Sequence, residues 1–152
     1  GLEAAEPMNM RMEMRCAGGV KILNDCYNAN PSSVIEALNT LQQIEHAGRR
    51  LAVLGEMREL GTAAADMHGH VARDAASRGL ELVLFVGDFA QQMKEKFIQA
   101  GGKRDQVMAC PDNHNAWSRL KSIIQPGDLI LLKASRGVRL ESLLHAIEQE
   151  FA

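Results

Sequence analysis

Short, largely apolar segments recur along this chain, and each is followed by a longer stretch in which apolar residues recur with helical spacing. The clearest of these segments cover residues 51–54, 82–86 and 128–132. A continuous apolar run of this length is typical of a strand that is buried on both faces of a sheet. Because strands that alternate with helices form right-handed βαβ units, the chain is predicted to fold as an α/β domain.

The full pattern predicts a three-layer, doubly wound, Rossmann-like domain around a mainly parallel sheet of about six strands. The expected strands cover residues 8–15, 20–23, 51–54, 82–86, 106–109 and 128–132, and the expected helices cover residues 31–47, 62–78, 89–100, 112–124 and 140–151. We expect Gly48 to end the first helix in a left-handed cap and Thr62 to cap the second. Residues 1–7 are interpreted as a linker or an expression remnant, and residues 8–152 as one domain.

The first expected strand alternates between methionines on one face and polar side chains on the other. This period of two is typical of a half-buried strand, so the methionines are interpreted as packing residues. Gly18 and Gly19 then allow a tight reversal into the second strand. The two strands would form a hairpin, with the first as an antiparallel edge of the sheet.

Composition excludes several classes of protein. With 46% hydrophobic and 24% charged residues, the 152-residue chain has the composition of a globular domain rather than a disordered one. Its net charge is −2 and its basic residues are scattered, so a nucleic-acid-binding surface is not indicated. No apolar run approaches the roughly 20 residues that a membrane helix needs. Three cysteines without metal-ligand spacing favour reduced thiols, and we expect a cytoplasmic monomer.

The turn after the second expected strand contains four side chains that form hydrogen bonds well: Asp25, Tyr27, Asn28 and Asn30. Asn30 is a good helix N-cap, and Pro31 suits the first helical position, so a helix should begin here. The four side chains would then lie where open α/β sheets bind ligands and where a helix dipole favours anions. The alternative is a connection that only caps the helix.

A second polar cluster follows the last expected strand and consists of Lys133, Ser135 and Arg136. Cations are unfavourable at a helix amino end, so something must compensate them. A bound anion would do so, and so would a neighbouring carboxylate, Glu56 or Asp25, in an internal salt bridge. Because the carboxyl ends of parallel strands share one edge of a sheet, we expect both polar turns to border a common cleft there.

Other common sites are not indicated. No strand is followed by a G-x-G-x-x-G or a phosphate-binding loop, and no serine or cysteine lies in a nucleophile elbow. His68 and His70 point to different faces of their helix, which argues against a pair of metal ligands. His68 is instead a candidate substrate-binding residue at the sheet edge, with a supporting or surface histidine as the alternative.

Three ordered motifs resemble the C-terminal domain of the Mur ligases, the ATP-dependent amide-forming enzymes of peptidoglycan precursor synthesis. Residues 24–31 are similar to the family's D-S-Y-N-A-N-P, with a cysteine in place of the serine. Residues 53–61 match V-L-G-x-M-x-E-L-G and are followed by His68, and residues 132–136 are similar to V-K-G-S-R, with an alanine in place of the glycine. The Tyr-Asn-Ala-Asn-Pro motif resembles that of the branch of the family that adds D-alanyl-D-alanine to UDP-N-acetylmuramoyl-tripeptide.

The resemblance implies a mechanism in which ATP phosphorylates a carboxylate, an amine attacks the acyl phosphate, and phosphate leaves as the amide forms. ATP and Mg²⁺ would bind to the full-length enzyme, with the magnesium ligands mainly outside this chain, which would be inactive alone. The candidate residues are Arg11, Asp25, Tyr27, Asn28 and Asn30 for ATP; Glu56, His68, Ser135 and Arg136 for the amine substrate; and Lys133 and Arg136 for catalysis. Asp25 would accept hydrogen bonds from the ribose, and Arg11 would face the γ-phosphate, although Met10 precedes it where the family has glycine.

Two alternatives remain open from the sequence. The first is a self-standing α/β module that binds a small anion or a protein partner. The second is the corresponding domain of a sister Mur ligase or a folate ligase with a different amino acid substrate.

Overall fold

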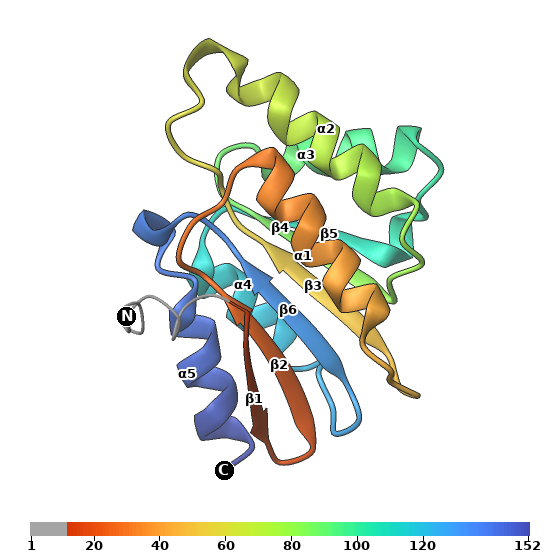
Figure 1. The fold of residues 1–152 in the computed structure, drawn as a ribbon, viewed down its shortest axis with the longest axis vertical. Helices are drawn as coiled ribbons and strands as arrows, with labels where there is room; N and C mark the ends of the chain where they lie inside the picture. The colour runs from red at the N-terminus through yellow and green to blue at the C-terminus, as the bar shows by residue number, and fades with distance from the viewer. Residues whose placement is uncertain (1–11) are drawn as a thin grey trace, which may run out of the picture.

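A six-stranded sheet forms the centre of the molecule in a computed structural model, which describes residues 12–152 (Figure 1). Its strands are β1 Glu13–Ala17, β2 Val20–Asp25, β3 Arg50–Leu54, β4 Leu82–Val86, β5 Val107–Cys110 and β6 Leu129–Lys133. Its α-helices are α1 Pro31–Gln43, α2 Ala64–Ala76, α3 Ala90–Gln99, α4 Asn113–Leu120 and α5 Glu141–Glu150. The three-layer α/β class predicted from the sequence is confirmed.

The strand order is β1-β2-β6-β3-β4-β5. Only β1, at one edge, runs antiparallel to its neighbour, and the other pairs are parallel. The predicted antiparallel N-terminal edge strand is therefore confirmed for the part of it that the structure describes, while residues 8–11 lie outside the described range. The packing role predicted for its methionines was wrong for Met12 and Met14, which are exposed. Strand β6, the last in sequence, lies between β2 and β3. Because the three strands are parallel, the turns that follow them meet at the edge of the sheet that is formed by the carboxyl ends of its strands.

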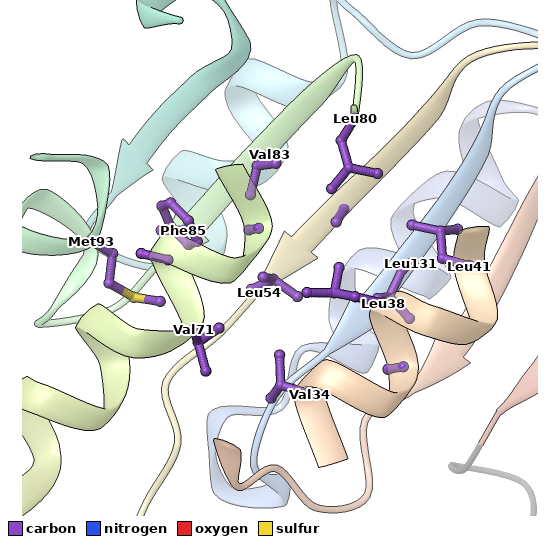
Figure 2. Close-up of a cluster of buried hydrophobic side chains, with 14 of the residues drawn as sticks. Val34, Leu38, Leu41, Leu54, Val71, Leu80, Val83, Phe85, Met93 and Leu131 are labelled. Carbon is purple, nitrogen blue, oxygen red and sulfur yellow. The ribbon is translucent and has the colours of Figure 1, made fainter. Parts of the chain in front are cut away.

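Two hydrophobic clusters, one on each face of the sheet, hold the helices against it. Helices α1, α2 and α3 cover one face, where Leu54, Phe85 and Leu131 point toward Val34, Leu38 and Val71 (Figure 2). Helices α4 and α5 cover the other face. Alternate residues of one strand enter opposite clusters, which is why the central strands have no polar face in the sequence.

The predicted helix ends were wrong in two places near α1 and α2. Helix α1 ends at Gln43 with Ile44 as its C-cap, so Gly48 caps nothing. Gly48 is required for a different reason, because a Cβ atom there would lie 2.1 Å from the Gly127 carbonyl oxygen. Thr62 lies in a 3₁₀ helix, η2 Gly61–Ala63, and α2 begins after it without a side-chain cap.

Helix α4 is also shorter than predicted, because it ends at Leu120 rather than near residue 124. The segment after it is held by other partners. The Arg49 guanidinium donates to the Ile123 carbonyl oxygen at 2.9 Å and to both oxygens of Asp128. A basic side chain that is distant in sequence thus binds a carbonyl group just beyond the end of α4.

Candidate functional site

The amino end of α1 is built as the sequence predicts. Asn30 is the N-cap, its side-chain oxygen accepts from the Ser33 amide at 2.9 Å, and the Ser33 hydroxyl accepts from the Asn30 amide at 3.0 Å. Pro31 occupies the first helical position. This reciprocal capping box satisfies two backbone donors, so the side-chain oxygen of Asn30 is already engaged by the helix. The capping interpretation therefore holds for Asn30, and its contact with ATP stays a prediction.

The two polar turns meet at the ends of β2 and β6. Asp25 and Lys133 are register partners in the parallel pair, and the Lys133 ammonium donates to the Asp25 carboxylate at 2.8 Å. The side chains are only 6% and 4% exposed. The expectation that both turns share one edge of the sheet is confirmed. The internal salt bridge is the interpretation that holds for Lys133, because each charge compensates the burial of the other.

Three adjoining hollows lie along this edge. The first, the β2 hollow, has a volume of about 490 Å³ and is lined by Met12, Asp25, Asn28, Ser32, Ser33, Glu36 and Lys133. The second, the central hollow, has a volume of about 290 Å³ and is lined by Tyr27, Asn28, Arg58, Glu59, Ser135, Arg136 and Gly137. Of the predicted residues of the first turn, Asp25 lines the β2 hollow, Tyr27 the central hollow and Asn28 both, whereas Asn30 lines neither.

Arg136 and Tyr27 face each other across the central hollow. The guanidinium carbon of Arg136 lies 5.5 Å from the centre of the Tyr27 ring, within the range of a cation–π interaction. Arg136 remains exposed and offers its donors to the hollow. A planar guanidinium that rests on an aromatic ring is well placed to bind a carboxylate or phosphate group.

Ser135 ties together the loops that follow three strands. Its amide donates to the Glu56 carbonyl oxygen at 3.2 Å, and its hydroxyl accepts from the Arg58 amide at 2.8 Å. The same hydroxyl donates to the Ala29 carbonyl oxygen at 3.5 Å. With 6% exposure, Ser135 is largely enclosed by these contacts. Its role in binding substrate stays a prediction, while its role in fixing the edge is visible in the structure.

His68 lies beneath the loop that joins β3 to α2 and has no exposed surface. Its Nε2 accepts from the Met57 amide at 3.0 Å, and its Nδ1 donates to the Ala64 carbonyl oxygen at 2.7 Å. The ring also stacks on Phe89, with 4.2 Å between ring centres. Burial lowers the pKa of His68, which favours the neutral ring. The structure thus places His68 as a supporting histidine, and direct substrate contact stays a prediction.

A third hollow of about 500 Å³, the β4 hollow, contains residues that sequence analysis did not select. It is lined by Glu56, Arg58, Val86, Gly87, Asp88, Pro111, Asp112, Asn113, Gly137 and Val138. Arg58 stands between this hollow and the central one. The signal that could have identified Arg58, Asp88 and Asn113 is position, because each follows soon after the carboxyl end of a parallel strand.

Glu56 is held at the floor of the β4 hollow by a close approach to Gly87. A Cβ atom at residue 87 would lie 2.9 Å from Glu56 Oε1, and the backbone of Gly87 has a φ of +123°. The same carboxylate oxygen accepts from the Asp88 amide at 3.4 Å. The φ of Gly87 favours glycine, and the absence of a side chain there leaves room for the Glu56 carboxylate beside its backbone.

Three further observations concern cofactors and membranes. Arg11 lies outside the described residues, so its predicted contact with the γ-phosphate is untested. Within residues 12–152, no group of three or more His, Cys, Asp or Glu side chains is arranged to hold a metal ion. None of the helices in this part of the chain combines the length and the apolar character that crossing a membrane requires.

Comparison with known proteins identifies the family of this chain. The family model described as "Mur ligase, glutamate ligase domain" matches residues 10–136. UDP-N-acetylmuramoyl-tripeptide–D-alanyl-D-alanine ligase from Bacillus subtilis is 30% identical over 145 residues, which is 95% of this chain and 32% of that protein. The chain therefore spans about a third of the length of the curated relatives that it matches.

Solved structures give the same result. The crystal structure II of MurF from Acinetobacter baumannii superposes with a TM-score of 0.82 at 27% identity, covering 91% of this chain and 30% of that one. MurF ligase from Thermotoga maritima, solved in complex with ADP, gives a TM-score of 0.73 at 27% identity, covering 93% of this chain and 31% of that one. The chain thus belongs to the Mur ligase family, as a domain of the MurF type.

Proposed function

We propose that the full-length protein is an ATP-dependent ligase of peptidoglycan synthesis that joins D-alanyl-D-alanine to UDP-N-acetylmuramoyl-tripeptide, and that residues 8–152 form its C-terminal domain. Family membership supports the ligase class, and the name of the Bacillus subtilis relative supports the substrates. One observation carries the proposal. The turn at Asp25 and the turn at Lys133–Arg136 meet at the carboxyl ends of β2 and β6, where they line two adjoining hollows.

The β2 hollow is the proposed nucleotide side. Its volume lies within the range typical of small-molecule sites, and its lining combines the carboxylate of Asp25 with the amide of Asn28 and two serine hydroxyls. A carboxylate is a suitable acceptor for two ribose hydroxyls, and Lys133 fixes its orientation. The Thermotoga maritima relative with bound ADP supports nucleotide binding by the family. Mg²⁺ would accompany ATP, with its ligands mainly in other domains.

The central hollow is the proposed carboxylate side of the dipeptide site. Arg136 and Arg58 both line it, and together they can neutralise the terminal carboxylate of D-alanyl-D-alanine. The dipeptide amine would then form the new C–N bond as the bond between the acyl carbon and the phosphate oxygen breaks, with loss of one amine proton. What this domain contributes is position and charge, since closing over the nucleotide excludes water and aligns the amine.

Lys133 and Arg136, which were both candidates for catalysis, receive different roles in this proposal. Lys133 is paired with Asp25 and enclosed, so we propose that it acts by orienting the nucleotide side. Arg136 is exposed in the hollow, so we propose that it touches the reacting groups or the dipeptide. Arg136 is therefore the better residue on which to test the proposal.

The test is a steady-state assay of phosphate release by the full-length ligase with ATP, UDP-N-acetylmuramoyl-tripeptide and D-alanyl-D-alanine. Removing one charge-stabilising donor typically lowers turnover by about 10²–10³-fold, so Arg136→Ala should fall in this range. Arg104→Ala is the matched control, because Arg104 begins η3 Arg104–Gln106 before β5, at the opposite edge of the sheet.

Three outcomes would contradict the proposal. Normal turnover by Arg136→Ala would remove Arg136 from the site. Phosphate release that does not depend on D-alanyl-D-alanine, or that another amino acid supports better, would contradict the assigned substrate. Amide formation by the 152-residue chain alone would contradict its role as one domain of a larger ligase.

A further inference from the structure

The loop that joins β3 to α2, residues 55–60, is anchored through three consecutive backbone groups. The Glu56 carbonyl oxygen accepts from the Ser135 amide, the Met57 amide donates to His68, and the Arg58 amide donates to the Ser135 hydroxyl. Ser135 holds the loop from the side of β6, whereas His68 holds it from the side of α2. The Met57 amide therefore lies at the centre of the anchored segment.

We propose that His68 is a positioning residue for the amine substrate. Through Nε2 it fixes the Met57 amide, and thereby holds Arg58 at the wall of the central and β4 hollows and Glu56 at the wall of the β4 hollow. In this role His68 touches neither substrate nor nucleotide. The activity part of the argument rests on the proposed function, while the structural part stands on the contacts of the described residues alone.

The geometry of the ring explains why a histidine is suited to this position. Nδ1 donates to the Ala64 carbonyl oxygen four residues earlier on α2, so that nitrogen carries the proton and Nε2 is left as the acceptor. The stack on Phe89, at an interplanar angle of 15°, restricts rotation of the ring. A rigid helix thus presents one lone pair to one backbone donor.

The loop needs such an anchor because its conformation is unfavourable in isolation. Glu59 has a φ of +64°, a left-handed conformation that non-glycine residues adopt only when their surroundings impose it. Gly61, at the end of the loop, has a φ of +60°. Met57, which is 2% exposed, lies before these two residues and fixes the middle of the loop in the hydrophobic core.

Loss of the hydrogen bond between His68 and Met57 should affect the central and β4 hollows more than the β2 hollow. Arg58 lines the central and β4 hollows, and Glu56 lines the β4 hollow. Neither lines the β2 hollow, which is formed by β2, the amino end of α1 and the end of β6. A displacement of the loop would therefore disturb the amine substrate more than the nucleotide. Misplacement by about 1 Å can cost about a hundredfold in rate, so the effect is measurable.

Two variants of the full-length enzyme separate hydrogen bonding from mere filling of space. His68→Leu keeps an apolar side chain in place but cannot accept from Met57. His68→Gln can offer its side-chain oxygen near the position of Nε2. We expect His68→Leu to raise KM for D-alanyl-D-alanine between about tenfold and hundredfold while KM for ATP changes less than about twofold, and His68→Gln to restore most of the loss.

A measurement that does not depend on substrate keeps the inference separate from the proposed function. Hydrogen exchange in the full-length enzyme, followed in a peptide that covers residues 55–60, should be slow in the wild type, fast in His68→Leu and intermediate in His68→Gln. Equal changes in both KM values, or unchanged exchange in His68→Leu, would overturn the inference. If exchange responds as expected but no dipeptide-dependent activity is found, the proposed function fails and the anchoring role of His68 stands.

Discussion

Replacing Lys133 by methionine tests whether the buried ion pair with Asp25 holds the two polar turns together. At 2.8 Å and an effective dielectric constant of about 20, the gross attraction is about 6 kcal/mol. Much of this offsets the removal of both charges from water. Losing one partner leaves the other charge buried, which typically costs about 3–5 kcal/mol. We expect Lys133→Met to lose that amount of unfolding free energy.

Urea unfolding followed by circular dichroism measures this loss. With a slope of about 2 kcal/mol per molar urea, the midpoint should fall by about 2 M. The control is the double variant Asp25→Leu with Lys133→Met, which removes both charges and should recover most of the stability. A loss below about 1 kcal/mol in Lys133→Met, or a double variant as unstable as the single one, would refute the argument that each charge compensates the other.

Three further predictions concern the local structure of the edge. Asn30→Ala removes the N-cap of α1 and should cost about 0.5–2 kcal/mol in urea unfolding, with a loss below that range contradicting the capping box. Gly87→Ala places a side chain at a φ of +123° and should cost about 1–3 kcal/mol, whereas neutral behaviour would contradict the strained backbone conformation at this position. Because the folded pKa of His68 lies below the ordinary 6.5, the unfolded chain binds the proton more readily. The urea midpoint of the wild type should therefore fall relative to His68→Gln between pH 7.5 and 5.5, and parallel profiles would contradict a buried neutral ring.

The parts of the fold that follow from local chemistry could be predicted from the sequence. The apolar runs at β3, β4 and β6 mark strands with no polar face, and Asn30 followed by Pro31 marks the beginning of a helix. These features depend on residues that are close together in the chain. At two of the helix ends that were predicted wrongly, those of α1 and α4, arginines from another part of the chain bind the carbonyl groups that follow: Arg50 binds that of Ile44, and Arg49 binds that of Ile123.

The candidate site divides in the same way. That Asp25 and Lys133 share an edge follows from the parallel sheet, but their direct pairing needs β6 to lie beside β2, which strand order alone decides. The sequence predicts that His68 lies on a helix. Its hydrogen bond with the Met57 amide, however, depends on the path of a loop that contains a left-handed residue, Glu59. The path of such a loop cannot be predicted from the types of its residues alone.

The most direct test of the shared site is a crystal structure of the full-length ligase with a non-hydrolysable ATP analogue and D-alanyl-D-alanine. The proposed function predicts that the ribose hydroxyls lie within hydrogen-bond distance of Asp25 and that the dipeptide carboxylate lies against Arg136 and Arg58. Ligands bound at the opposite edge of the sheet, or a nucleotide that leaves Asp25 without contact, would contradict it.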